Sequence, residues 1–211
     1  MIIVDELKNR ALILNSRPNG YPDDSNFKLI EIDIPDINPG EFIVKVLWLS
    51  VDPYMRGRMS DKKSYAPSVE IGDIMVGGAV GKIISSRNSE FEVGDLVEGR
   101  FGWQEYAISN GSNARKLTIQ EADISKALGV LGMPGLTAYF GLFSLGKPIP
   151  NDTVVISAAS GAVGAVVGQL AKLAGCKVVG IVGSDTKASY IKDELNFDHA
   201  INYKKEDVCN R

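Results

Sequence analysis

Residues 154–187 read VVISAASGAVGAVVGQLAKLAGCKVVGIVGSDTK, and this stretch decides the fold of the second half of the chain. Val154 to Ser157 is a short apolar run typical of a buried strand, and a glycine-containing turn follows it. Ala162 to Ala174 has the pattern of an apolar helix closed by Gly175, and Lys177 to Val182 is a second strand. This order of strand, turn, helix and strand predicts an α/β unit with a parallel sheet.

The turn between the first strand and the helix has the glycine pattern of a dinucleotide-binding site. Gly161 would let a pyrophosphate approach the backbone, and Gly164 would let the helix pack closely on the strand. The first glycine of the G-x-G-x-x-G pattern is replaced by alanine, and an ordinary tight turn is the alternative interpretation. The helix N-terminus supplies backbone N–H donors for a phosphate. The candidate cofactor-binding residues of this turn are Ala159, Gly161, Ala162, Val163 and Gly164.

The end of the second strand distinguishes between the two nicotinamide cofactors. An NAD site usually has an acidic residue there that binds the ribose 2′-hydroxyl, but the expected position falls near Gly183. Gly183 has no side chain that would repel a 2′-phosphate, Ser184 can donate a hydrogen bond, and Lys187 carries a positive charge. In the alternative, Asp185 is the ribose acid and Lys187 is a solvated helix residue. The sequence favours NADP.

The α/β pattern extends to both sides of this stretch. On the carboxyl side, Lys187 to Glu194 predicts a second helix and Ala200 to Tyr203 begins a third strand. On the amino side, Ile119 to Leu131 is compatible with a helix, and Gly135 to Leu145 predicts a short apolar helix. The change of period places a domain boundary at about residue 123, between a first domain over 1–123 and a second over 124–211.

The first domain reads as short strands separated by turns, which predicts a small barrel. Glu41 to Leu49 is rich in β-branched and aromatic residues and predicts a central strand. The other predicted strands are Phe27 to Ile34, Met75 to Ile84 with its bulge-prone glycines, Asp95 to Glu98, and Trp103 to Ile108.

Composition excludes several classes of protein. The chain has 211 residues with 23 Lys plus Arg and 26 Asp plus Glu, so its net charge is −3 and nucleic acid is not an expected partner. Its 45% hydrophobic content suffices for a globular core. No apolar run is long enough to span a membrane, and the N-terminus carries Asp5 and Glu6, unlike a signal peptide. We expect a cytoplasmic protein.

Metal and triad chemistry are disfavoured by the small number of suitable side chains. Cys176 and Cys209 are the two cysteines, and His199 is the single histidine. A three-ligand catalytic zinc would need all of them, although they lack the spacing of zinc ligands. A nucleophilic triad would also need His199, which reads more simply as a surface or loop residue. We expect no metal site.

Five motifs, found in one order along essentially the whole chain, resemble the zinc-independent medium-chain dehydrogenase/reductases. The resemblance is strongest to their NADPH-dependent alkenal, prostaglandin and curcumin double-bond reductases, a quinone oxidoreductase-like branch. It implies a GroES-like barrel domain, for substrate and catalysis, followed by a Rossmann NADP-binding domain with a doubly wound parallel sheet. The motifs are LSVDPYMRGRM (49–59), VGDLVEGRFGWQEY (93–106), LGMPGLTAYFGL (131–142), AASGAVGAVVGQLAKLAGCKVVGIVGS (158–184) and AINYK (200–204).

The resemblance also implies an activity and roles for particular residues. It implies hydride transfer from NADPH to the β-carbon of an α,β-unsaturated aldehyde or ketone, without zinc, because Val51 to Tyr54 replaces the turn that carries a cysteine ligand in zinc-dependent relatives. Tyr54 and Thr137 match positions beside the nicotinamide, while Ser184, Lys187 and Tyr203 match the 2′-phosphate end. The alternatives are a turn aromatic for Tyr54, helix capping or packing for Thr137, and an ordinary strand residue for Tyr203.

The chain stops before a complete Rossmann sheet. Three further strand–helix units would follow AINYK in a six-stranded sheet, so only its N-terminal half is expected, and the chain reads as a fragment or truncated product. The 211 residues alone are therefore expected to turn over enones or quinones only at background rate. A quinone reductase of the same fold and a truncated, non-catalytic nucleotide-binding or subunit-interaction protein remain alternatives. The resemblance implies a homodimer for the full-length form.

Overall fold

The structure is a computed structural model that describes residues 7–208, except for the side chain of residue 122. It divides into two compact units, Met1–Leu128 and Gly129–Arg211. The change of sequence pattern placed the boundary slightly earlier, at about residue 123. Each unit has its own sheets and its own hydrophobic core.

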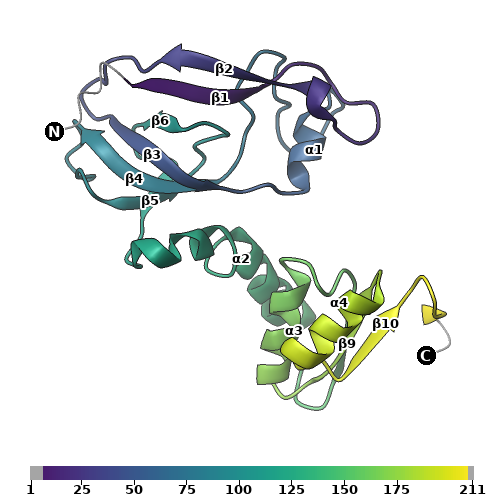
Figure 1. Cartoon of the computed structure of the whole chain (residues 1–211). Coiled ribbons are helices and arrows are strands. Elements are labelled where there is room, and N and C mark those ends of the chain that lie inside the picture. Colours follow the sequence, from purple (N-terminus) through teal and green to yellow (C-terminus); the bar gives the residue numbers. More distant parts are fainter. Residues whose placement is uncertain (1–6, 209–211) are drawn as a thin grey trace. The chain divides into compact units, whose positions relative to one another are not determined.

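The first unit is built from antiparallel strands that form a curled half-barrel (Figure 1). β1 (Lys8–Leu14) pairs with β2 (Phe27–Asp33), and isolated bridges from Ala11 to Gln104 and from Ile13 to Ile74 link β1 to the rest of the unit. A five-stranded sheet has the order β6-β3-β4-β5-β7. Its strands are β3 (Phe42–Leu49), β4 (Ala79–Ser86), β5 (Leu96–Gly99), β6 (Tyr106–Ser109) and β7 (Ala114–Lys116).

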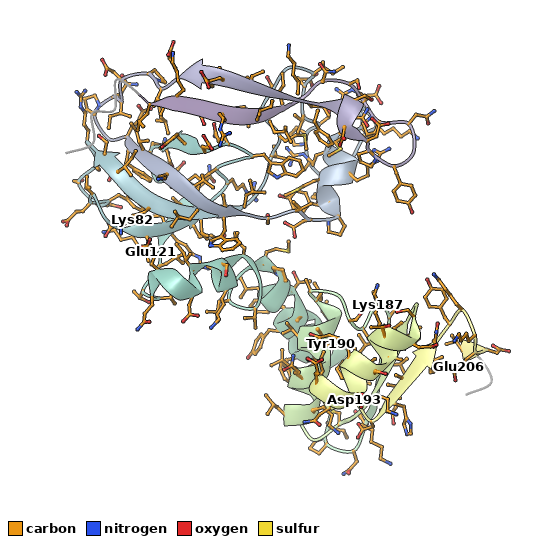
Figure 2. The ribbon with its side chains drawn as sticks, in the orientation of Figure 1. Lys82, Glu121, Lys187, Tyr190, Asp193 and Glu206 are labelled. Carbon is orange, nitrogen blue, oxygen red and sulfur yellow. The ribbon has the colours of Figure 1, made fainter. Side chains whose placement is uncertain are left out.

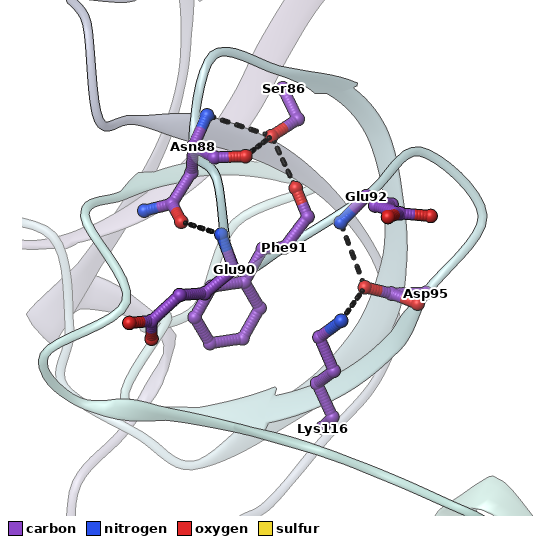
Figure 3. Close-up of polar contacts among 7 residues, drawn as sticks. All are labelled: Ser86, Asn88, Glu90, Phe91, Glu92, Asp95 and Lys116. Atoms are coloured by element: carbon purple, nitrogen blue, oxygen red, sulfur yellow. Dashed lines mark hydrogen bonds and ion pairs between the residues drawn. The ribbon is translucent and has the colours of Figure 1, made fainter.

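A buried cluster holds this five-stranded sheet together. Phe42 and Val44 of β3 pack with Val97 of β5, and the Phe42 ring stacks on Phe91 with 4.6 Å between ring centroids. The loop that carries Phe91 is fixed by polar contacts at both ends (Figure 3). Asp95 accepts a hydrogen bond from the Glu92 N–H at 2.8 Å and pairs with Lys116 of β7 at 2.7 Å.

The predicted strands of the first unit are present, but two of them begin later than expected. β4 begins at Ala79 rather than at residue 75, and β6 begins at Tyr106 rather than at residue 103. Met75 and Trp103 instead hydrogen-bond to each other, with the Trp103 N–H donating to the Met75 carbonyl at 2.9 Å. The segments just before β4 and just before β6 therefore pair irregularly, outside the regular ladder.

Five elements of this unit differ from the sequence predictions. β1, β7 and the short helix α1 (Tyr54–Arg58) were not predicted. The helix expected near residues 119–131 is the 3₁₀-helix η3 (Glu121–Leu128). A short 3₁₀ turn near the start of the chain, η2 (Asp24–Asn26), was not predicted either. Ile124 and Ala127 of η3 are buried against Val80 of β4, which explains the apolar spacing seen in the sequence.

The second unit contains a three-stranded parallel sheet of order β10-β9-β8, the N-terminal half of a Rossmann sheet. Its strands are β8 (Thr153–Ile156), β9 (Lys177–Val182) and β10 (His199–Asn202). Helix α2 (Met133–Tyr139) continues into the π-helix η4 (Phe140–Gly146), and α4 (Asp185–Ser189) continues into the π-helix η5 (Tyr190–Glu194). Helix α3 (Gly164–Leu173) connects β8 to β9, and Figure 1 shows it beside β9.

The strand expected to be buried at residues 154–157 is largely exposed. In β8 only Ile156 is buried, and 59% of Val155 is exposed. β8 lies at the edge of the three described parallel strands, so its outer side has no described neighbour. Val154 and Ile156 face the core cluster of the unit, whereas Val155 alternates to the opposite face of the sheet, which explains its exposure.

Close contacts hold α3 and the helices after β9 against the sheet. A Cβ at Gly168 would lie 1.9 Å from Cζ of Phe197, and Phe197 is buried. A Cβ at Gly180 of β9 would lie 2.4 Å from the Ile191 Cδ1 atom. Glycine at these two positions lets large side chains fill the interface.

None of the helices within residues 7–208 has the length and apolar character of a membrane span.

Candidate functional site

The turn after β8 contains an alanine where the expected pattern has its first glycine. Ala159 is fully buried, and its N–H donates to the Ile181 carbonyl at 3.2 Å. A Cβ at Gly180 of β9 would lie 2.8 Å from the Ala159 Cβ. The Ala159 methyl group thus occupies space that Gly180 leaves open, which explains how this turn tolerates the replacement.

The two remaining glycines of the turn have different surroundings. A Cβ at Gly164 would lie 2.6 Å from the Ala158 carbonyl oxygen and 2.9 Å from the Ala159 Cα, so only glycine fits at the start of α3. A Cβ at Gly161 would meet only the Ala158 carbonyl oxygen, at 3.1 Å. Packing therefore explains Gly164, whereas a Cβ at Gly161 would meet a single backbone atom and is less strictly excluded.

The N-terminus of α3 is suited to a phosphate group. The first N–H groups of a helix have no acceptor within the helix, and the helix dipole places partial positive charge there. The first turn of α3 contains no acidic side chain, and Val163 at the N-cap position makes no side-chain capping bond. Gly161 and Ala162 are exposed just before the helix. These features fit the pyrophosphate of a dinucleotide.

The ends of β9 and β10 bring together three of the predicted 2′-phosphate residues. A Cβ at Gly183 would lie 3.1 Å from the Tyr203 hydroxyl oxygen, and the Tyr203 N–H donates to the Val182 carbonyl at 3.1 Å. Ser184 caps α4, where its hydroxyl oxygen accepts from the Lys187 N–H at 3.3 Å. The ring of Tyr203 thus lies against Gly183, next to the start of α4.

Lys187 supplies a positive charge close to this contact. Its side chain is exposed on α4 (Figure 2). Among residues 7–208, no carboxylate forms an ion pair with it. An exposed lysine without an ion pair is available to a phosphate, and the role of Lys187 at the 2′-phosphate stays a prediction.

Asp185, the alternative candidate for a ribose acid, already has two partners. Its Oδ1 atom accepts from the side-chain amide of Asn202 at 2.7 Å, and its Oδ2 atom pairs with Lys205. The hydrogen bond from Lys205, followed by that from Asn202, lowers the pKa of Asp185. Sequence reasoning missed Asn202 and Lys205. Their position around Tyr203, at the carboxyl end of the third strand, was the feature of the sequence that could have identified them.

Tyr54 and Thr137, predicted to lie beside the nicotinamide, belong to different units. Tyr54 is the first residue of α1 and is half-buried, and burial, with a further contribution from Asp52, raises the pKa of its hydroxyl. Thr137 is exposed on α2, and its hydroxyl donates to the Met133 carbonyl at 2.7 Å. This bond agrees with a packing role in its own helix, and the nicotinamide roles of both residues remain predictions.

The potential metal ligands do not form a cluster. Within residues 7–208, no three His, Cys, Asp or Glu side chains are grouped so that they could hold a metal ion. His199 is an exposed strand residue, and Cys176 is buried, with its thiol donating to the Ile149 carbonyl at 3.5 Å. Cys209 lies outside the described residues.

Comparison with known proteins relates both units to oxidoreductases. Residues 10–117 match the family model described as the N-terminal domain of oxidoreductase, and residues 162–211 match the one described as zinc-binding dehydrogenase. The NADPH-dependent curcumin reductase of Escherichia coli (strain K12) is 46% identical over 202 residues, which are 96% of this chain and 59% of that protein. The NADP(+)-dependent 2-alkenal reductase of Nicotiana tabacum is 40% identical over 97% of this chain and 61% of its own length.

A solved structure agrees with this assignment. CurA from Vibrio vulnificus, in complex with NADPH, aligns with a TM-score of 0.88 and 50% sequence identity. The alignment covers 92% of this chain and 58% of CurA, so the chain spans less than two thirds of the relatives that it matches. The chain belongs to the medium-chain dehydrogenase/reductase family, in its quinone oxidoreductase-like branch of curcumin, prostaglandin and alkenal reductases.

Proposed function

We propose that this protein is an NADPH-dependent reductase that acts on the C=C bond of α,β-unsaturated aldehydes and ketones. The observation that carries the proposal is the contact of Tyr203 with Gly183 beside Lys187, because this strand end offers a phosphate site and no free acid. The names of the curcumin and 2-alkenal reductases support the class of substrate.

The second unit would hold the cofactor by its phosphates. The pyrophosphate would lie over Gly161 at the N-terminus of α3, where backbone N–H groups can donate to it. The 2′-phosphate would accept from Lys187, Tyr203 and the Ser184 hydroxyl, which retains its own proton as a donor. Bound NADPH would supply the hydride that adds to the β-carbon of the substrate.

Tyr54 and Thr137 would act at the reacting end. The hydroxyl of a tyrosine is protonated at neutral pH, and burial raises the pKa of Tyr54 further, so this hydroxyl can donate a hydrogen bond to a carbonyl oxygen that gains negative charge. The Thr137 hydroxyl already donates to Met133, so its oxygen would serve as an acceptor. Both residues would orient groups rather than form a covalent bond.

The proposal includes a small-molecule enone or enal as the partner and a zinc-independent reaction. It also includes a homodimer of the full-length form and a cytoplasmic location, both of which rest on the family resemblance and the composition. Light scattering on the purified protein measures the oligomeric state directly.

The test is turnover by the full-length form with NADPH that carries deuterium at the transferable position. The proposed reaction puts deuterium on the β-carbon and leaves a saturated carbonyl compound, which NMR detects. An allylic alcohol, or turnover of quinones alone, would contradict the proposed substrate class. NADPH binding measured in the same preparation separates a failure of cofactor binding from a failure of chemistry.

A further inference from the structure

Asn202, the last residue of β10, is a buried polar residue with hydrogen bonds in three directions. Only 4% of it is exposed. Its backbone N–H donates to a Glu206 carboxylate oxygen at 3.0 Å, and its side-chain oxygen accepts from the Lys204 N–H at 3.2 Å. Its side-chain amide donates to Asp185 at 2.7 Å. Asn202 therefore links the end of β10 to the start of α4.

Asp185 is the acidic residue in the first turn of α4, and both of its carboxylate oxygens are engaged. Asn202 donates to one oxygen, and Lys205 pairs with the other. Both donors come from the segment around Tyr203. Figure 2 places Glu206 of this segment and Lys187 of α4 in the same unit.

The contacts of Asp185 with Asn202 and Lys205 bear on cofactor choice because of where Asp185 lies. A free carboxylate at the end of the second strand of a Rossmann unit binds the ribose 2′-hydroxyl of NAD. The same charge would repel a 2′-phosphate, since like charges a few ångströms apart disfavour each other. Asn202 and Lys205 each bind one carboxylate oxygen of Asp185 and so hold the carboxylate in one orientation, and Lys205 offsets its charge.

We propose that Asn202 is a positioning residue for cofactor selectivity, which restrains Asp185 so that this carboxylate does not serve the ribose. The inference rests on the proposed NADPH-dependent function and identifies what makes the site select a 2′-phosphate. Asn202 itself need not contact the cofactor, because it acts through Asp185.

The test is a double-mutant cycle on the ratio of NADPH to NADH affinity, measured by fluorescence titration. Asn202→Ala is expected to lower the preference for NADPH by about tenfold, since a charge-assisted hydrogen bond is lost. Asp185→Asn removes the charge and retains an acceptor for Asn202, so it is expected to keep the preference. In the double variant, the effect of Asn202→Ala should fall below about twofold, because the carboxylate on which it acts is gone.

A matched control uses another lysine–carboxylate pair of the same unit. Lys172 pairs with Asp198 at 2.7 Å, and Asp198 also accepts from the Val178 N–H at 2.6 Å. Lys172→Ala is expected to leave the cofactor ratio unchanged. Where Asn202→Ala fails to fold, Lys205→Met tests the same restraint at an exposed position and should lower the preference in the same direction.

The outcomes separate this inference from the proposed function. An unaltered protein that binds NADPH and NADH equally well overturns both. A clear NADPH preference that neither Asn202→Ala nor Lys205→Met reduces overturns only the role of Asn202. An equal loss of preference with and without Asp185→Asn shows a general structural effect and likewise overturns the inference.

Discussion

The glycines of the turn after β8 show that one sequence motif can combine two physical requirements. Gly164 is required by packing, because any side chain there would meet the backbone of Ala158 and Ala159. A Cβ at Gly161 would meet only the Ala158 carbonyl oxygen, at 3.1 Å, and we propose that a bound pyrophosphate is the reason for glycine there. Alanine stands at position 159 because Gly180 on the next strand makes room for its methyl group.

Substitution by alanine separates these two requirements. Gly164→Ala is expected to lower the free energy of unfolding by about 1 to 3 kcal/mol, because backbone atoms have to move. Gly161→Ala is expected to change stability much less and to weaken NADPH binding, since the added methyl group lies where the pyrophosphate approaches. Urea unfolding and NADPH titration of both variants check this, and equal losses of stability would contradict it.

Lys187 provides a test of the 2′-phosphate end. Lys187→Ala is expected to weaken NADPH binding by about 1 to 3 kcal/mol, because a charge-assisted contact is lost, and to leave NADH binding nearly unchanged. Folding should be unaffected, since the side chain is exposed. Calorimetric titration with both cofactors measures the difference. A similar loss for NADPH and NADH would mean that Lys187 does not bind the phosphate.

At the level of elements, the sequence predicted the α/β unit well and the barrel unit less well. β9 has the predicted bounds, because Lys177–Val182 is a short β-branched run flanked by turns, a local signal. β1 was missed because the buried polar residue Asn9 interrupts the apolar alternation of its sequence, KNRALIL, and β7 has only three residues. Tertiary pairing that leaves little local pattern defines both strands.

In the candidate site too, the parts defined by local sequence could be predicted, and the parts defined by tertiary contacts could not. The glycine turn and the Gly183 position could be predicted because a strand, a turn and a helix adjacent in sequence define them. The hydrogen bond from Asn202 to Asp185 could not be predicted, because the two residues are 17 positions apart and helical residues lie between them. For β8 the sequence predicted more burial than the structure has. The strand was expected to be buried, but 59% of Val155 is exposed.

The packing of α3 on Phe197 gives a prediction at this scale. Gly168→Ala is expected to lower the free energy of unfolding by about 1 to 3 kcal/mol, because the new methyl group would overlap the buried Phe197 ring. The double variant Gly168→Ala with Phe197→Leu should recover part of this loss, since leucine leaves room for the methyl group. Chemical denaturation measures both. A double variant that loses the sum of the two single effects would contradict direct packing between α3 and Phe197.

For the whole molecule, restrained carboxylates predict how stability depends on pH. The hydrogen bond from Lys116, with the Glu92 N–H second, lowers the pKa of Asp95 in the first unit (Figure 3). The hydrogen bond from Lys172, with the Val178 N–H second, lowers the pKa of Asp198 in the second unit. A carboxyl with a lowered pKa stabilises the folded state above its unfolded pKa of about 3.9. This stability is lost as the pH falls through the folded-state pKa.

Asp95→Asn tests this dependence. The variant is expected to be less stable than the unaltered protein at neutral pH and to lose less stability between neutral and acidic pH. Lys116→Met should reduce the pH dependence in the same direction, because it removes the largest cause of the shift. Melting temperatures over a pH series measure both effects. An unchanged dependence in both variants would contradict a stabilising role for the pair.

The central claim is that the second unit binds NADPH through the N-terminus of α3 and the ends of β9 and β10. A crystal structure of the protein with NADP⁺ tests it most directly. We predict that the pyrophosphate lies over Gly161 and that the 2′-phosphate contacts the side chains of Lys187 and Tyr203. A bound cofactor with its 2′-phosphate away from both residues, or with Asp185 on its ribose, would contradict the claim.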